Sequence, residues 1–149
     1  MKKIFVMLLL VAGMAGVANA QVDGNAIGLR FGNAGEISYQ HALSGATRVE
    51  IDLGFGSWRH GGAYLNVIHH WVKDLSSLQD GFNWFYGVGG ALGTFDSGFS
   101  AGVVGNLGIE YNFEFPLQLA LDWRPGFYIV PNATYLGWDG IALSARWRF

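Results

Sequence analysis

Apolar and non-apolar side chains alternate one by one along the last nine residues of the chain. The apolar positions are Ile141, Leu143, Ala145, Trp147 and Phe149, and small or basic residues lie between them. Because successive side chains of a β-strand point to opposite faces, this period of two predicts a strand with one apolar face. No stretch after residue 20 has the ~20 consecutive apolar residues of a membrane-spanning helix. The chain is therefore expected to be built from strands.

The same alternation recurs upstream. It predicts strands over residues 27–31, 37–41, 48–55, 63–74, 82–92, 102–113, 117–124 and 141–149. The pieces between them are rich in Gly, Asn, Asp and Ser, which is typical of turns. These expected turns are residues 32–35, 44–46, 57–62, 75–81, 93–98, 114–116 and 131–139. An all-β fold follows: an eight-stranded antiparallel up-and-down transmembrane β-barrel, the smallest common closed membrane barrel.

The first twenty residues have the pattern of a cleaved secretory signal peptide. Lys2 and Lys3 precede an apolar run, and the small residues Ala18-Asn19-Ala20 form the expected cleavage site. The predicted domains are therefore a signal peptide over residues 1–20 and an outer-membrane β-barrel over residues 21–149. The chain has no Cys, so neither disulfides nor thiolate metal sites contribute.

Composition separates the chain from soluble and nucleic-acid-binding proteins. Without Lys2 and Lys3 the nine basic residues fall to seven, against eleven acidic ones, and the net charge changes from −2 to −4. Phosphate binding needs a basic patch, so nucleic acid is not an expected partner. Only 13% of residues are charged, and the mean hydropathy is +0.26. Soluble surfaces carry roughly a quarter to a third charged residues. A soluble, lipocalin-like barrel with the apolar face inward is the alternative to a membrane barrel.

Aromatic residues near the predicted strand ends favour the membrane barrel, because such barrels carry an aromatic girdle at each interface. One rim is expected to hold Trp71, Trp84, Tyr111, Phe113, Phe115, Trp147 and Phe149. The other is expected to hold Phe31, Phe55, Trp58, Tyr64, Tyr128 and Trp138.

The polar face of the strands then lines the lumen and carries charges of both signs. The expected lumen network is Arg30, Gln40, Arg48, Glu50, Asp52, Asn66, Asn106, Glu110, Asp122, Arg124, Arg146 and Arg148. Charges removed from water must be paired, and eight strands enclose just enough room for side chains. We therefore expect a plugged or narrow lumen, with a small-solute or ion pore as the alternative. His70 should join the lumen while His69 faces outward, so the two do not chelate one metal ion.

A proline, a group of glycines and a few polar loop residues each need an explanation. Pro125, with Gly126, is expected at a bulge or at the start of the outer rim, because proline lacks a donor for the sheet. The glycines at positions 87, 89, 90 and 93 are expected beside large lumen residues or at bends. A lipid A-modifying enzyme would need Ser, His and carboxylate groups to converge, and the loop residues available are Arg59, His60, Asp96 and Ser97. No local nucleophile signature accompanies them, so we predict no enzyme, no cofactor and no metal.

The chain also resembles known outer-membrane proteins. The ending with Leu143, Ala145, Trp147 and Phe149 resembles the C-terminal assembly signal of such proteins, which implies the barrel-assembly machinery as a partner during insertion. Three further segments resemble small outer-membrane β-barrel proteins typical of Bacteroidetes, in the broad porin-like and OmpX/OmpA-barrel group. They are residues 35–41 (GEISYQH), 108–113 (GIEYNF) and 119–126 (LALDWRPG). The resemblance implies the barrel fold and a Gram-negative outer membrane as the location, and it offers no catalytic residues to transfer. We expect a non-enzymatic monomer in the lipid of that membrane, with a structural, envelope or surface-interaction role.

Overall fold

A computed structural model describes residues 24–149 of the chain, except residues 33, 56–61, 96–97, 131–132 and 139. The predicted signal peptide lies outside the described residues, as do Trp58, Arg59, His60, Asp96 and Ser97. The described strands are β1 (Ala26–Phe31), β2 (Gly35–Ala42), β3 (Thr47–Phe55), β4 (Ala63–Asp74), β5 (Phe82–Phe95), β6 (Gly98–Asn112), β7 (Leu117–Trp123), β8 (Gly126–Val130), β9 (Ala133–Gly137) and β10 (Ile141–Arg148).

None of the described residues belongs to a helix long and apolar enough to cross a membrane.

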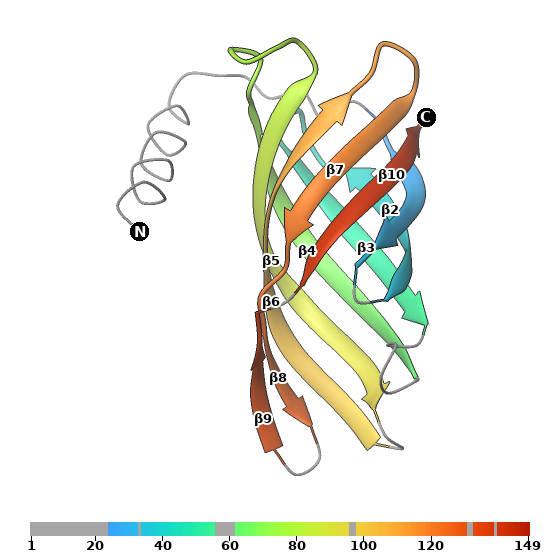
Figure 1. The fold of residues 1–149 in the computed structure, drawn as a ribbon, viewed down its shortest axis with the longest axis vertical. Coiled ribbons are helices and arrows are strands. Elements are labelled where there is room, and N and C mark those ends of the chain that lie inside the picture. The colour runs from blue at the N-terminus through green and yellow to red at the C-terminus, as the bar shows by residue number, and fades with distance from the viewer. Residues whose placement is uncertain (1–23, 33, 56–61, 96–97, 131–132, 139) are drawn as a thin grey trace, which may run out of the picture.

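The strands form one antiparallel sheet that closes on itself (Figure 1). Consecutive strands from β1 to β6 pair with each other, β6 pairs with β7 and β8, and β10 joins β7 to β1. β7 and β8 share one register on β6, where Leu107 pairs with Trp123 and Val104 with Gly126. They are therefore one barrel strand interrupted at Pro125, and β9 with β10 forms another. The predicted eight-stranded antiparallel barrel is confirmed.

The interruption coincides with a β-bulge. Gly126 pairs with Gly137, and Trp123 pairs with Ile141. Two residues on one strand therefore face three on the other, so residues 138–140 contain one extra residue opposite Pro125. The carbonyl of Pro125 still accepts a hydrogen bond from the Gly105 N–H at 2.8 Å, whereas proline has no N–H to donate back to β6. The registers therefore place a bulge at the level of this proline, with the extra residue on the strand opposite it rather than at Pro125 and Gly126 themselves.

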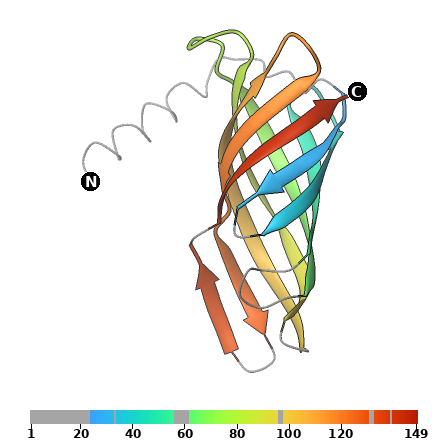
Figure 2. The same cartoon turned by 45° about the vertical axis from the view of Figure 1, so that its right-hand side comes forward.

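Two expected turns are largely strand. β9 occupies much of the turn expected over residues 131–139, and β8, just before it, was not predicted. The turn expected over residues 93–98 is shortened by β5 and β6, which pair up to Phe95 and Gly98. Glycine and asparagine at these places indicate turns locally, but pairing with a neighbouring strand stabilises extended backbone. β8 and β9 form a hairpin at the end of the barrel away from the C-terminus (Figures 1 and 2).

The barrel has polar residues inside and apolar residues outside. Leu29 and Leu121 face outward and are 47% and 48% exposed, whereas Asp52 and Arg146 face inward and are 0% and 1% exposed. Inside, the apolar clusters are small, one of them formed by Val72, Phe85 and Ala120. This arrangement excludes the lipocalin-like alternative, which requires an apolar interior.

Aromatic rings inside the barrel lie over glycines on the neighbouring strand. A Cβ atom built on each glycine would lie 2.2–2.7 Å from a ring atom, so only glycine leaves room for the ring. The cross-strand pairs are Tyr64 over Gly54, His70 over Gly87, Phe85 over Gly108 and Tyr128 over Gly102. The expected large lumen partner is therefore confirmed for Gly87. The assignment of Tyr64 and Tyr128 to a lipid-facing girdle is wrong, because both share the inward-facing side of their strands.

Candidate functional site

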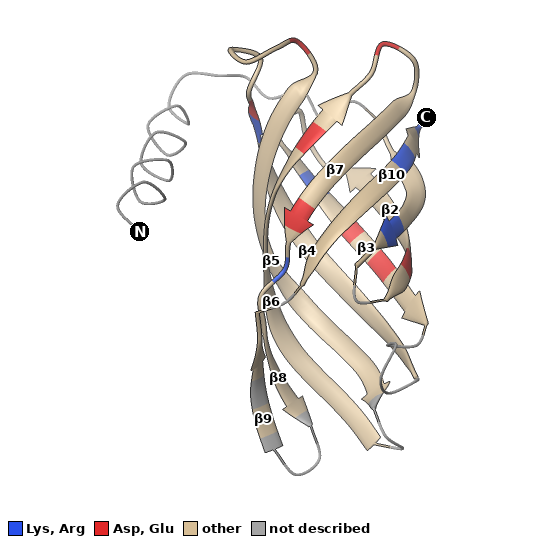
Figure 3. Ribbon diagram, in the orientation of Figure 1, with Lys and Arg blue, Asp and Glu red and all other residues tan. Residues whose placement is uncertain are grey.

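The candidate site is the network of polar side chains inside the barrel. Of the predicted lumen set, Arg148 is half-buried at the end of β10, and the other members are buried, with at most 6% exposed. The charged residues of the described strands gather in the half of the barrel nearest the C-terminus (Figure 3). The site is built by alternation, because every second residue of each strand points inward.

Arg124 is the hub of the network. It follows β7, and its guanidinium group reaches across the lumen to β2 and β3. Nη1 donates to Glu36 at 3.1 Å, and Nη2 donates to Asp52 and, at 3.4 Å, to Glu50. One cation therefore neutralises part of the charge of three carboxylates, and it ties β7 to strands on the far wall.

Arg30 on β1 forms the neighbouring set of contacts. It holds Asp122 in a two-point contact, with Nη2 to Oδ1 at 2.6 Å and Nε to Oδ2 at 3.1 Å, and its Nη1 donates to Glu36 at 3.2 Å. The Tyr64 hydroxyl also donates to Glu36, at 2.6 Å, and Asn106 donates to Asp122 at 3.0 Å. Planar two-point pairing of this kind is among the strongest ionic contacts in proteins.

Arg146 on β10 occupies the next level toward the C-terminal end. Its Nε donates to the Ser38 hydroxyl at 2.8 Å and its Nη1 to Gln118 at 3.3 Å, while Nη2 lies 3.1 Å from a Glu50 oxygen. Gln40 donates to the same Glu50 carboxylate at 2.7 Å. Glu50 therefore links the Arg124 and Arg146 levels into one network.

Arg48 and Glu110 form a further ion pair, between β3 and β6. The two guanidinium nitrogens of Arg48 donate to the two Glu110 oxygens at 3.0 and 2.7 Å, and Nε donates to His70 Nδ1 at 3.2 Å. Phe85 lies beneath the Arg48 guanidinium group, 5.0 Å from it, and Asn83 donates to Glu110 at 3.3 Å. Arg, carboxylate and aromatic groups therefore fill this end of the lumen.

The two adjacent histidines point to opposite faces, as the alternation requires. His70 is fully buried in the lumen, whereas the His69 ring packs on the outer face against Trp71, with ring centroids 4.5 Å apart. Within the described part of the chain, no group of three His, Asp or Glu side chains is arranged to hold a metal ion.

Sequence reasoning missed several members of the network. Glu36 and Ser38 lie on the inward face of β2 together with Gln40, and Gln118 lies on that of β7 with Asp122. Their two-residue spacing was the signal that could have found them. Tyr64 was missed for a different reason, because an aromatic residue near a strand end resembles a girdle residue and only the tertiary structure shows its hydroxyl bonded to Glu36.

The buried network contains four guanidinium groups and five carboxylates, held together by direct contacts among strands from all sides of the barrel. Buried charges require such partners, since an unpaired charge out of water costs several kcal/mol. The arrangement fills the half of the lumen nearest the C-terminus with mutually bonded side chains (Figure 3), which is the geometry of a plug.

Comparison with known proteins supports the architecture. No family model matches the chain, and no curated protein matches it in sequence. Among solved structures, the crystal structure of Neisserial surface protein A is similar, with a TM-score of 0.59 and 13% sequence identity. The match covers 84% of this chain and 93% of that protein. At this identity the likeness shows a shared fold, the closed eight-stranded barrel.

Proposed function

We propose that this protein is a non-enzymatic, integral outer-membrane barrel with a plugged lumen and a structural, envelope or surface-contact role. The observation that carries the proposal is the inverted distribution of polarity. Buried Arg and carboxylate groups fill the interior, while Leu, Ile, Val and Phe cover the outer wall. Water would solvate such an exterior poorly, whereas bilayer hydrocarbon matches it.

The aromatic residues near the turn between β4 and β5 support the same placement. The rings of Trp71 and Tyr86 stack with centroids 5.4 Å apart, and Trp84 packs beside Tyr86 at 5.5 Å. On the next strand, Tyr111 meets Phe113 at 4.7 Å. Amphipathic rings of this kind prefer the headgroup level of a bilayer. We infer that they form the periplasmic girdle.

Assembly and origin belong to the same proposal. The alternating C-terminal strand with Leu143, Ala145, Trp147 and Phe149 would be recognised by the barrel-assembly machinery after export by the signal peptide. The sequence resemblance to barrel proteins typical of Bacteroidetes supports a Gram-negative outer membrane as the location. We propose a monomer, because the closed barrel needs no second chain to complete its wall.

The alternative of a small-solute or ion pore is less well supported by the contacts. A selective pore usually presents a ring of one charge sign around open water. Here positive and negative groups bond to each other across the lumen. The single side chain of Arg124, for example, contacts carboxylates on two other strands. A path for ions would have to break these pairs.

Three measurements test the proposal in sequence. Outer-membrane fractions should contain the protein as a faster-migrating band in unboiled samples than in boiled ones, and recovery from the periplasm without detergent would contradict it. Folded protein in planar bilayers should show no stepwise conductance, and steady single-channel steps would favour the pore. An altered lipid A mass spectrum on overexpression would instead favour an enzyme.

A further inference from the structure

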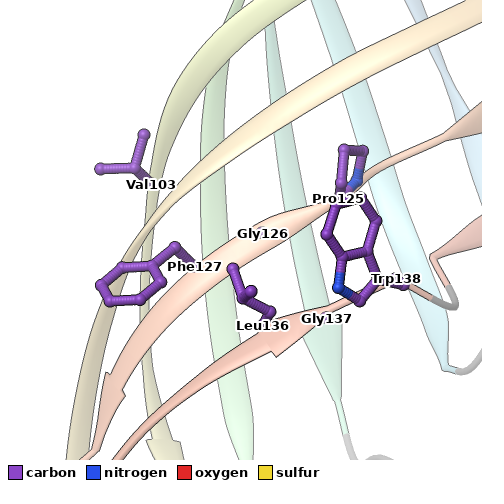
Figure 4. Close-up of a pocket in the computed structure, with 7 residues that line it drawn as sticks. All are labelled: Val103, Pro125, Gly126, Phe127, Leu136, Gly137 and Trp138. Carbon is purple, nitrogen blue, oxygen red and sulfur yellow. The ribbon is translucent and has the colours of Figure 1, made fainter.

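The outer wall of the barrel has an apolar pocket where its strands are interrupted. The pocket has a volume of about 190 Å³ and opens on the outer faces of β6, β8 and β9 (Figure 4). Its lining is formed by Val103, Pro125, Phe127, Leu136 and Trp138, together with Gly126 and Gly137. None of these residues belongs to the ion network.

The pocket arises from missing bulk in one row of outward-facing residues. Val103, Phe127 and Leu136 are register partners on three neighbouring strands, so their side chains form one bulky row. The next outward row contains Gly105 on β6 and Pro125 between β7 and β8. The Gly105 N–H donates a backbone hydrogen bond to the Pro125 carbonyl oxygen. Glycine has no side chain and proline presents a flat ring. The wall is therefore recessed beneath the bulky row.

Trp138 closes one side of the pocket, and Trp123 holds it in position. Its ring stacks on Trp123 with centroids 5.9 Å apart and planes inclined by 22°. The Trp123 Nε1 also donates to the Trp138 carbonyl oxygen at 2.8 Å. The indole is thus held by a ring contact and by a backbone anchor, which gives the pocket a defined shape.

We propose that this pocket binds an acyl chain of a membrane lipid, an inference that rests on the membrane location proposed above. The lining carries no charged side chain and is continuous with the exposed apolar wall at Leu107 and Ile129. Hydrocarbon holds no water to fill a recess, and an empty recess forfeits van der Waals contacts. An apolar cavity of about 150 Å³ accommodates benzene, so the space here suits several methylene groups of one chain.

A bound chain would connect two parts of the wall. Among the described strands, β9 pairs with β8 alone, and the β8–β9 hairpin joins the rest of the barrel through the ladder between β8 and β6. An acyl chain in the pocket would touch Leu136 of the hairpin and Val103 of β6 at the same time. It therefore acts as a structural ligand across the interrupted strand.

Gly105→Leu adds a side chain to the recessed row beside the pocket, next to its lining residue Pro125, and leaves the backbone undisturbed. A Cβ atom at this position would lie 3.6 Å from the Pro125 ring and 3.9 Å from the Gly87 carbonyl oxygen, both ordinary contacts. The matched control is Gly35→Leu, at an exposed glycine on β2 with no atom within 4 Å of the added Cβ. A heat-shift gel establishes first that each variant folds.

The probe is phosphatidylcholine carrying a diazirine on its acyl chain, in vesicles that contain the full protein, with crosslinked peptides mapped by mass spectrometry. A few additional van der Waals contacts between the acyl chain and the pocket correspond to about three-fold more label around the pocket than on the wall at Leu29. The enrichment should disappear in Gly105→Leu and persist in Gly35→Leu. Uniform labelling of inserted protein, or enrichment that survives Gly105→Leu, overturns the site. Failure of the wild-type protein to insert contradicts the proposed membrane function instead.

Discussion

Replacing Arg124 by Met removes the hub cation of the lumen while keeping an unbranched apolar side chain in its place. The three carboxylates that it contacts differ in how many other partners remain to them after the substitution. Glu36 keeps Arg30 and the Tyr64 hydroxyl, and Glu50 keeps Arg146 and Gln40. Asp52 is fully buried, and the cation bonded to it within the described network is Arg124. The cost of the substitution is therefore expected to come mainly from Asp52.

Removing one partner of a buried ion pair costs ~3–5 kcal/mol, because an uncompensated charge stays behind. We expect Arg124→Met to lower the free energy of unfolding by about that amount. Adding Asp52→Asn removes the stranded charge, so the double variant should recover most of the loss. Asp52→Asn alone should cost less, ~1–3 kcal/mol, since Arg124 retains Glu36 and Glu50.

The measurement is urea-induced unfolding of the protein in lipid vesicles, followed by tryptophan fluorescence. The wild type, the two single variants and the double variant are compared as a double-mutant cycle. Arg148→Met serves as the control cation. Its Nη2 donates to the Phe113 and Phe115 carbonyl oxygens at 2.6 and 3.2 Å, and the residue is half-buried at the barrel end. Water can replace those contacts, so its loss should cost less than that of Arg124.

Two results would refute this reasoning. One is an Arg124→Met protein within ~1 kcal/mol of wild type, which would mean that the network contributes no more than an exposed ion pair. The other is a double variant no more stable than Arg124→Met, which would show that Asp52 is not the stranded charge.

Three further substitutions address the wall, the interior packing and the C-terminal strand. Leu121→Arg places a charge on the outer face and should reduce the heat-shifted folded fraction, at a cost of ~2–4 kcal/mol near the bilayer midplane, whereas normal folding beside a Leu121→Ala control would contradict a lipid-facing wall. Gly54→Val should destabilise the barrel by ~1–3 kcal/mol in urea, because its Cβ would overlap the Tyr64 ring, and Tyr64→Ser in the same chain should relieve the loss if that overlap is the cause. Phe149→Ala keeps the backbone hydrogen bonds to Asn25 at 2.8 and 3.0 Å, so it should slow assembly in cells while leaving refolding in detergent unchanged, and equal slowing of both would indicate a purely structural role.

The strands and their faces could be predicted from sequence because alternation is a local property. Leu119 and Leu121 alternate with Gln118 and Asp122, and the structure places the first pair outside and the second pair inside. The count of eight barrel strands also held. It held although β8 and β9 were missed, because each of them continues a barrel strand that was predicted.

The partners inside the lumen could not be predicted, because they are set by closure of the sheet. Arg30 and Asp122 are 92 residues apart, and Arg124 and Asp52 are 72 apart. A local pattern shows that each charge points inward but not which carboxylate it meets. Tyr64 shows the same limit, because its ring lies over Gly54 only once β3 and β4 have paired.

The sequence by itself determined that this chain forms strands with one apolar face, and its two-residue period assigned side chains to the wall or to the lumen. The tertiary structure alone decided the ion pairs, the aromatic rings over cross-strand glycines and the bulge opposite Pro125. The physical reason is that a strand's own backbone geometry fixes which way its side chains point, whereas contacts across the barrel depend on register and closure, which involve every strand at once.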